Sequence, residues 1–173
     1  GLETIEERSK GLLKFVTDYK NLTRLPKPSF ESLPLDSLFG HMENLFARDM
    51  ETAEIDFRIT KPEDGFSIWA DTQMIQQVLI NLLKNSMEAV ENSEKPIIRL
   101  EAFAEDGRTG IRVSDNGKGI DPEHADKIFV PFFTTRKKGS GIGLSLSRQI
   151  MRLHKGSIYF HSDRNGTTFV LEF

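Results

Sequence analysis

The sequence predicts an α+β fold, in which helices cover one face of a mixed β-sheet to form a two-layer α/β sandwich. Two observations lead to this prediction. Paired runs of alternating apolar and polar residues flank turn signals such as Asp106-Gly107 and Asn165-Gly166, as in antiparallel hairpins. Between these pairs lie longer segments with apolar residues at helical spacing. We expect helices at 2–24, 36–50, 72–91 and 142–154, and strands at 54–60, 66–70, 97–104, 109–114, 157–162 and 167–173.

The composition excludes several classes of protein. The 173 residues carry a net charge of −3 and an isoelectric point near 5.9, so no basic field is available to attract nucleic acid. The chain has no cysteine, which rules out disulfides and thiolate metal sites. No apolar run approaches the roughly 18 residues that cross a bilayer. We therefore expect a globular domain without a nucleic-acid partner.

The first predicted helix, at 2–24, has apolar residues at spacings of three, four and seven. This pattern suits the seam of a helical bundle, and a surface helix packed on its own domain is the alternative. Pro26 and Pro28 end the helix, because proline lacks the N–H group and disfavours helix in the preceding residue. We expect a helical segment at 1–25, a linker at 26–32 and a second domain at 33–173.

The third predicted helix carries a candidate metal ligand. Asp36 opens the second predicted helix and Asp71 precedes the third, and both are the expected N-caps. Asn81 and Asn85 lie one turn apart near the border of the apolar stripe, where both side chains can point into one site. An amide oxygen is a suitable ligand for Mg²⁺, which also binds substrate phosphates. The alternative is that both asparagines are solvated helix positions.

Two glycine-rich turns bracket the segment from Asp115 to Leu144. Asp115 ends a predicted strand and is followed by glycines, so its carboxylate can accept a hydrogen bond from an exocyclic amine. The second turn, residues 139–143, opens a helix, where backbone N–H groups favour phosphate. It matches neither the dinucleotide fingerprint nor a P-loop. Between the turns, residues 134–138 form a polar, basic tract that suits a lid over phosphates. We expect a nucleotide between the turns, and plain loops are the alternative.

Five motifs in this order resemble those of the ATP-binding catalytic domain of sensor histidine kinases of two-component systems. They are the N box at Asn81–Ser86, the G1 box at Asp115–Gly119, the F box at Phe129–Phe133, the G2 box at Gly139–Leu144 and a last adenine-side motif at Gly166–Phe169. The match covers about residues 33–173, and the Phe-Phe-Thr-Thr segment is most similar to the nitrogen-regulation branch. The resemblance implies the Bergerat fold, a mixed sheet covered by three helices.

The resemblance also implies roles for individual residues, with ATP and Mg²⁺ as the bound molecules. Asp115 would bond the adenine amine and Thr167 would lie near the same ring. Asn81 and Asn85 would be the catalytic residues, and Asn85 would ligate Mg²⁺. The other residues implied for the nucleotide pocket are Gly117, Gly119, Ile120, Phe133, Thr134, Arg136, Lys137, Gly139, Gly141, Gly143 and Leu144.

A comparison with related ATPases and one departure from the family refine these expectations. Related ATPases that hydrolyse ATP carry a glutamate where this chain has Asn81, and an amide cannot take a proton from water as a carboxylate can. We therefore expect the pocket to hold ATP for an incoming nucleophile. Glu88 stands where many histidine kinases carry a basic residue, so Arg136, Lys137 or Lys138 would contact the phosphates instead.

None of the four histidines, His41, His124, His154 and His161, has the context of the family's phosphoacceptor, which lies on a dimerising helix and precedes an acidic residue. The segment at 2–24 resembles the second helix of that hairpin. We therefore expect part of a longer kinase that binds ATP without phosphorylating itself. The implied partners are its own dimerisation and phosphoacceptor domain, a response-regulator receiver domain and a second copy in a homodimer. The implied location is cytoplasmic, with membrane anchoring of the full-length protein left open.

Other functions stay open at this point. Within the same fold, a hydrolytic ATPase or an anti-sigma-type protein-serine kinase is possible. Asn81 argues against the first, and the N-terminal helix with its proline linker argues against the second. A non-catalytic nucleotide-binding interaction module belongs to a different class, and only an assay with an acceptor histidine separates it from a kinase.

Overall fold

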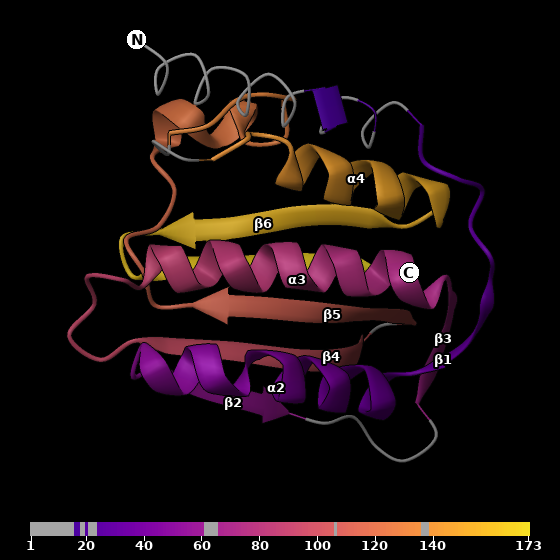
Figure 1. The fold of residues 1–173 in the computed structure, drawn as a ribbon, viewed down its shortest axis with the longest axis horizontal. Coiled ribbons are helices and arrows are strands. Elements are labelled where there is room, and N and C mark those ends of the chain that lie inside the picture. The colour runs from indigo at the N-terminus through magenta and orange to yellow at the C-terminus, as the bar shows by residue number, and fades with distance from the viewer. Residues whose placement is uncertain (1–15, 18–19, 21–23, 61–65, 106, 136–138) are drawn as a thin grey trace, which may run out of the picture.

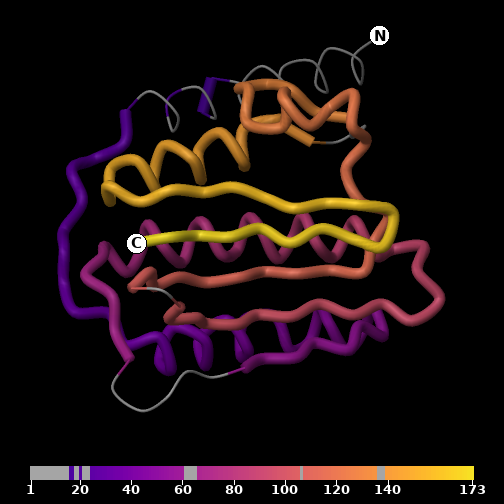
Figure 2. Tube along the Cα trace, turned by 180° about the vertical axis from the view of Figure 1, so that it is seen from behind, coloured from indigo at the N-terminus to yellow at the C-terminus, as the bar shows by residue number. Residues whose placement is uncertain are grey.

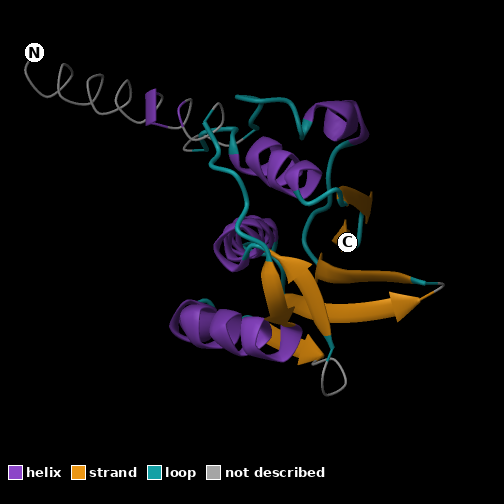
Figure 3. Cartoon of the chain, turned by 90° about the vertical axis from the view of Figure 1, so that its right-hand side faces the viewer, coloured by secondary structure: helices purple, strands orange, loops and turns teal. Residues whose placement is uncertain are grey.

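The computed structural model describes residues 16, 17, 20, 24–60, 66–105, 107–135 and 139–173, so the helix predicted at 2–24 lies mostly outside the described residues. Its main sheet has five strands, in the order β2 (Asp56–Thr60), β4 (Ile97–Glu105), β5 (Arg108–Asp115), β7 (Gly166–Glu172) and β6 (Ser157–Asp163). Helices α2 (Leu35–Thr52), α3 (Thr72–Ala89) and α4 (Gly143–Leu153) lie on one face of it (Figures 1 and 3). Seen from behind, the strands lie in front of these helices (Figure 2). The predicted two-layer α+β sandwich is confirmed.

The sheet is mixed, and its central strands are antiparallel. β4 pairs with β5 and β6 pairs with β7 as the two predicted hairpins, and β5 pairs with β7 so that Asp115 lies opposite Thr167. β2 is an edge strand that pairs with β4 in parallel. The β5–β7 pairing matters most for function, because it joins the G1 box to the last adenine-side motif at one end of the sheet.

Helix α3 fills the centre of the helical layer and provides most of its core contacts. Its fully buried residues are Ile75, Val78, Leu79, Leu82 and Leu83. Full burial of one such side chain contributes about 1.5–3 kcal/mol relative to leaving it exposed. Asp71 is the N-cap of α3, since its side chain accepts a hydrogen bond from Met74 N at 3.0 Å, as predicted. The fixed axis of α3 positions every residue that it contributes to the site.

The N-cap prediction for Asp36 is wrong. Helix α2 begins at Leu35, its N-cap is Pro34, and no side chain caps it. Asp36 therefore lies inside the first turn, where a carboxylate still interacts favourably with the helix dipole. The helix starts one residue earlier than predicted, at Leu35, whose side chain is completely buried in the core.

A second, two-stranded sheet was not predicted. β1 (Glu31–Pro34) pairs antiparallel with β3 (Ser67–Ala70), so the two strand-like runs that flank residues 61–65 belong to different sheets. One hydrogen bond attaches the segment before β1 to the start of α3, and a second joins the start of α3 to the end of α4. Ser29 N donates to Asp71 Oδ2 at 2.8 Å, and Asp71 N donates to His154 Nε2 at 3.0 Å. The start of α3, the end of α4 and the chain before β1 are thereby held together.

The loop between β5 and the F box contains a short 3₁₀-helix, η1 (Pro122–Lys127), which was not predicted from the sequence. Asp121 caps it by accepting a hydrogen bond from Glu123 N at 2.9 Å. Among the described residues, no helix has the length and apolar character needed to cross a membrane.

Candidate functional site

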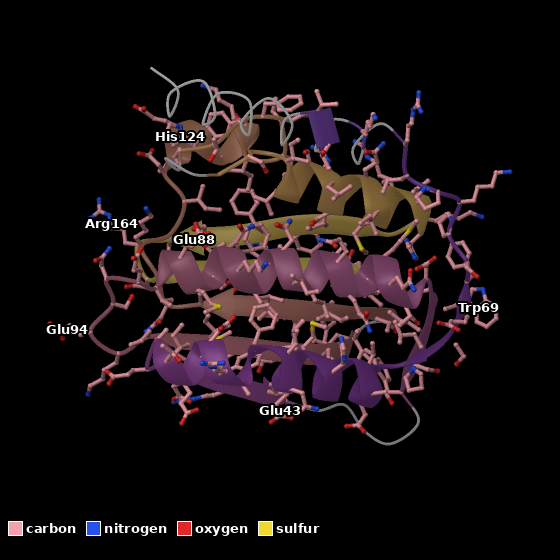
Figure 4. The ribbon with its side chains drawn as sticks, viewed as in Figure 1. Glu43, Trp69, Glu88, Glu94, His124 and Arg164 are labelled. Atoms are coloured by element: carbon pink, nitrogen blue, oxygen red, sulfur yellow. The ribbon has the colours of Figure 1, made fainter. Side chains whose placement is uncertain are left out.

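The candidate site lies at the end of the sheet where β5 and β6 finish and α3 ends. Figure 4 labels Glu88 on α3, His124 on η1 and Arg164 in the β6–β7 turn at this end, with Trp69 at the opposite end. We name these the site end and the cap end, and the cap end contains the N-terminus of α3 and the β4–β5 hairpin. The glycine turns and the N box predicted from the sequence meet at the site end.

Asp115, the last residue of β5, is the most constrained polar group of the site. Its side chain is only 9% exposed. Oδ1 accepts hydrogen bonds from Gly117 N at 3.0 Å and Thr167 N at 3.3 Å, and Oδ2 accepts one from Ser86 Oγ at 3.0 Å. Since a carboxylate offers about four acceptor positions, one is left, and it lies on Oδ2. This donor set fits a ligand that presents one N–H group to Oδ2.

Two opposing effects act on the ionisation of Asp115. Burial raises its pKa, because the charged form loses water, while the hydrogen bonds from Gly117, Ser86 and Thr167 act to lower it. Burial is the larger effect, and the pKa is raised above the ordinary carboxyl value. A raised pKa in a carboxylate with an open acceptor position is typical of a functional group.

A chain of hydroxyl groups connects the G1 box to the β6–β7 hairpin. Ser162 Oγ donates to Gly166 O at 3.1 Å and accepts from Ile120 N at 2.8 Å. Ser162 Oγ also lies 3.0 Å from Thr167 Oγ1. Because the single hydroxyl hydrogen of Ser162 goes to a carbonyl, Thr167 must be the donor in this last bond. The lone pairs of Thr167 Oγ1 then remain available to accept a hydrogen bond from a ligand.

The G1 glycines allow close packing of the backbone. A Cβ atom on Gly117 would lie 2.5 Å from the carbonyl oxygen of Ala89, at the end of α3. Gly119 has φ +72°, and a Cβ atom there would overlap the carbonyl of Asp163. The turn therefore fits between α3 and the β6–β7 hairpin only with glycine at both positions.

Asn81 connects α3 to the G2 box. Its Nδ2 donates to Ser147 Oγ at 2.9 Å, and that hydroxyl donates in turn to Gly143 O at 3.0 Å. A Cβ atom on Gly143 would overlap the Asn81 amide, so the glycine lets α4 approach α3. Asn85 is half-buried one turn further along α3. Asn81 thus lies near the middle of α3 and is already bonded to α4, and Asn85 lies one turn closer to the site end.

The N-terminus of α4 provides the second half of the site. The helix begins at Gly143, and its N-cap residue Ile142 makes no side-chain capping bond. Leu144 is half-buried in the first turn and Gly139 is exposed in the segment before it. Free N–H groups at the start of a helix bind anions, and the helix dipole favours negative charge there. This arrangement fits a phosphate group.

The segment between the F box and the G2 box is closed at its base. Phe132 N donates to Gly141 O at 2.8 Å, and both residues have positive φ, +67° for Phe132 and +69° for Gly141. A left-handed conformation is rare for a bulky residue and tends to occur at functional sites. Phe133 contacts the ring of His124 at a centroid distance of 5.4 Å, and Thr134 is exposed. Arg136, Lys137 and Lys138 lie outside the described residues.

A separate groove of about 840 Å³ lies beside the site, between the C-terminal ends of α2 and α3. Glu88 lines it, together with acidic residues such as Glu54 and Glu91. No residue predicted to bind nucleotide lines this groove. We place the site at Asp115 rather than in the groove, because the Asp115 carboxylate is buried and keeps one acceptor position open.

Three serines of the site were not identified from the sequence. Ser86 bonds Asp115, Ser147 bonds Asn81, and Ser162 links Ile120 to Thr167. The sequence contained a signal for Ser86, since a polar residue within the apolar stripe of α3 must find a buried partner. No such signal exists for Ser147 and Ser162, because their partners come from distant segments.

Comparison with known proteins identifies the family of this chain. The histidine kinase-, DNA gyrase B-, and HSP90-like ATPase family model matches residues 70–173. The sensor histidine kinase ZraS of Escherichia coli K12 is 30% identical over 170 residues, which is 98% of this chain and 36% of ZraS. A putative NtrY-like sensor histidine kinase of Rickettsia felis is 33% identical over 161 residues, 89% of this chain and 26% of the relative. The chain thus spans about a third of the length of the curated relatives it matches.

Solved structures agree as well. The nucleotide-free catalytic domain of histidine kinase ThkA is 33% identical, with a TM-score of 0.75 over 84% of this chain and 97% of that one. ThkA in complex with the response regulator protein TrrA has a TM-score of 0.80 at 29% identity, over 98% of this chain and 49% of that one. The predicted resemblance to histidine kinase catalytic domains, NtrY-like kinases included, is confirmed. The chain belongs to the family of histidine kinase-, DNA gyrase B- and HSP90-like ATPases.

Proposed function

We propose that this domain binds Mg-ATP and transfers the γ-phosphoryl group to a histidine on a dimerisation helix in two-component signal transduction. The observation that carries the proposal is the single open acceptor position on Asp115 Oδ2, beside Thr167. A buried carboxylate with one unfilled position suits the exocyclic amine of adenine, because a charge-assisted hydrogen bond there compensates the burial.

In this proposal, each side of the site has a distinct role. Asp115 and Thr167 bind the base. The uncapped N-terminus of α4, with Gly141 and Gly143, receives the phosphates, and Arg136 or Lys137 adds positive charge. Asn85 holds Mg²⁺, which neutralises the charge that develops on the transferred phosphoryl group. Positioning and charge neutralisation supply most of what such a transfer requires.

Asn81 supports transfer over hydrolysis. An amide cannot act as a general base toward water. Its Nδ2 is moreover bonded to Ser147, which fixes α4 relative to α3. We propose that Asn81 positions the phosphate-binding end of α4, so that the phosphoryl group is held for an incoming histidine.

The proposed partners belong to the longer protein. They are its dimerisation and phosphoacceptor domain, in a homodimer, and the receiver domain of a response regulator. The structure of ThkA with a response regulator supports such a pairing, since 98% of this chain superposes on 49% of that histidine kinase.

The test is to supply the missing acceptor. The chain is mixed with Mg²⁺, γ-labelled ATP and a dimerisation hairpin that carries a histidine followed by an acidic residue. We expect acid-labile, base-stable label on the hairpin, and none on a hairpin with that histidine changed to glutamine. Asn85→Ala is expected to remove the Mg²⁺ dependence of ATP binding.

The same assay separates the other candidates. Phosphate release without a hairpin indicates a hydrolytic ATPase, and acid-stable label on serine indicates a serine kinase. ATP binding with no transfer to any hairpin tested indicates a non-catalytic module. Each of these results would overturn the proposed phosphotransfer.

A further inference from the structure

Ser86 stands out among the buried serines of the helical layer. It is 1% exposed, on the inner face of α3, and its hydroxyl crosses to Asp115 Oδ2 on β5. Ser145 and Ser147 are also buried in a helix, but their hydroxyls donate to carbonyls of their own helix, Ile142 O and Gly143 O. Serine in a helix commonly makes such a local bond. Ser86 instead donates its hydroxyl hydrogen to another element of the fold, and the acceptor is the carboxylate that the proposed function assigns to the base.

We infer that Ser86 determines the purine specificity of the site, by holding Asp115 as an aligned acceptor for a base with an exocyclic amine. This inference rests on the proposed function, in which Asp115 binds the base. Ser86 is a positioning residue, because it acts through Asp115.

The geometry explains how a hydroxyl can set specificity. With Oδ1 occupied by two backbone N–H groups and Oδ2 by the Ser86 hydroxyl, the carboxylate can neither rotate nor accept from more than one further donor. An amine satisfies that position. A carbonyl in the same place, as in hypoxanthine, puts two acceptors together and leaves both unpaired, which is costly in a buried site.

Ser86 also favours the ionised carboxylate. Burial raises the pKa of Asp115, and the Ser86 hydroxyl is one of three donors that oppose the rise. No described charged side chain faces the carboxylate from the elements packed around it. Lys84 and Glu88 on α3, Lys95 before β4, Lys118 in the turn and Asp163 and Arg164 after β6 are exposed, and Arg99 and Arg112 lie on the opposite face of the sheet. The protonation state therefore depends on the hydrogen bonds.

Loss of the Ser86 hydroxyl should weaken the preference for adenine over hypoxanthine in two ways. Without Ser86 the carboxylate is less restrained, and it stays protonated to a higher pH. A protonated carboxyl group can donate a hydrogen bond to a carbonyl, so a base with an oxygen in place of the amine becomes acceptable.

The test compares Ser86→Ala with the parent chain in calorimetric titrations with ADP and IDP, which differ in this one substituent and carry no γ-phosphoryl group to transfer. We expect the parent to prefer ADP and Ser86→Ala to lose about tenfold of that preference, the effect of one hydrogen bond to a charged group. The pH below which ADP binding weakens should be higher in the variant. Ser86→Cys keeps the side-chain size with a weaker donor and should give an intermediate result.

A matched control and a direct readout separate positioning from general damage. Ser114→Ala removes one hydroxyl from a half-buried serine on β5, where it accepts a hydrogen bond from Thr168 Oγ1, and it should leave the preference and the pH profile unchanged. The ¹³C carboxyl resonance of Asp115, identified by its absence in Asp115→Asn, should titrate at a higher pH in Ser86→Ala. If the parent binds ADP and Ser86→Ala keeps the same preference and titration, this inference is overturned and the proposed function stands. If the parent binds neither diphosphate, both are overturned.

Discussion

Two aspartates lie near opposite ends of α3 and show how differently a carboxylate can be used in one domain. Asp71, at the cap end, accepts hydrogen bonds from Met74 N and Ser29 N, and its own N–H group bonds His154. Asp115, at the site end, accepts three bonds and keeps one position open. Burial acts to raise the pKa of both, but at Asp71 the backbone N–H groups outweigh it and the net pKa is lowered. At Asp115 burial prevails, and the pKa is raised.

The difference separates a structural group from a functional one. A carboxylate that stabilises a fold is ionised at little cost, because the native state supplies all its donors. A carboxylate that binds a ligand is held partly unsatisfied, and the ligand completes it. The two ends of α3 therefore predict opposite responses to substitution, which the following experiments test.

The largest effect is expected for Asp115→Asn. The substitution replaces the charged acceptor and places an amide hydrogen toward the incoming amine, so ATP affinity should fall about 100-fold, close to 3 kcal/mol. Stability at neutral pH should not fall, because the buried charge is removed as well. Calorimetry with a non-hydrolysable ATP analogue measures the affinity, and thermal unfolding measures the stability. Asp163→Asn, an exposed position at the same end of the sheet, is the control. Unchanged affinity in Asp115→Asn would refute the role of Asp115.

The next effect concerns the backbone at the two ends. Gly119 and Gly107 both have positive φ, +72° and +75°, but a Cβ atom would meet the Asp163 carbonyl at the first and open space at the second. Gly107→Ala should cost about 1 kcal/mol from the left-handed conformation alone. Gly119→Ala should cost about 2 kcal/mol more through overpacking. Chemical denaturation of both variants gives the difference, and equal losses would show that the turn can shift at no cost.

Much of this fold could be predicted from the sequence, because periodicity and turn residues encode local structure. The helices and both hairpins followed from spacing and from turns such as Asn165-Gly166. Short elements did not follow. β1 contains a proline and has four residues, and η1 is a single six-residue segment, so neither shows a measurable period. The parallel pairing of β2 with β4 is set by tertiary packing and leaves no local signal.

The residues of the candidate site fall into the same two groups, those that could be predicted from the sequence and those that could not. Asp115, Asn81 and the glycine turns were identified because their residue types stand out at fixed spacing. Ser162 was missed because a lone serine gives no signal and its partner Ile120 lies 42 residues away, whereas Ser86 was missed although its place in the apolar stripe of α3 indicates a buried partner. The sequence does not show which residues of distant elements lie side by side. The site is formed by contacts of that kind.

A smaller effect is expected at the cap end from Asp71→Ala. Loss of an N-cap typically costs about 1 kcal/mol, and the bond to Ser29 N is lost as well. ATP affinity should change by less than about twofold, since binding and capping use separate carboxylates. Denaturation gives the stability and calorimetry the affinity. A large loss of affinity would show that the two ends are coupled through α3, and the comparison would then fail.

The smallest effect is the pH dependence, and its sign differs between the ends. Asp71 has a pKa below its ordinary value of 3.8 in the folded state, so its contribution to stability is present above that value and declines as pH falls through the folded pKa. Asp115 has a raised folded pKa, so the native state binds its proton more tightly than the unfolded chain. The unfolding free energy then declines as pH rises from 3.8 through the folded pKa of Asp115.

Denaturation at several pH values should therefore show the advantage of the parent over Asp71→Ala shrinking toward acid. If Asp115→Asn has a larger unfolding free energy than the parent, that difference should also shrink toward acid, since acid protonates the buried carboxylate of the parent. ATP binding to the parent should strengthen with rising pH over the window in which Asp115 lowers the stability of the fold. If both variants instead follow the parent at a constant offset, neither carboxylate changes its ionisation on folding. The contrast between the two ends would then rest on geometry alone.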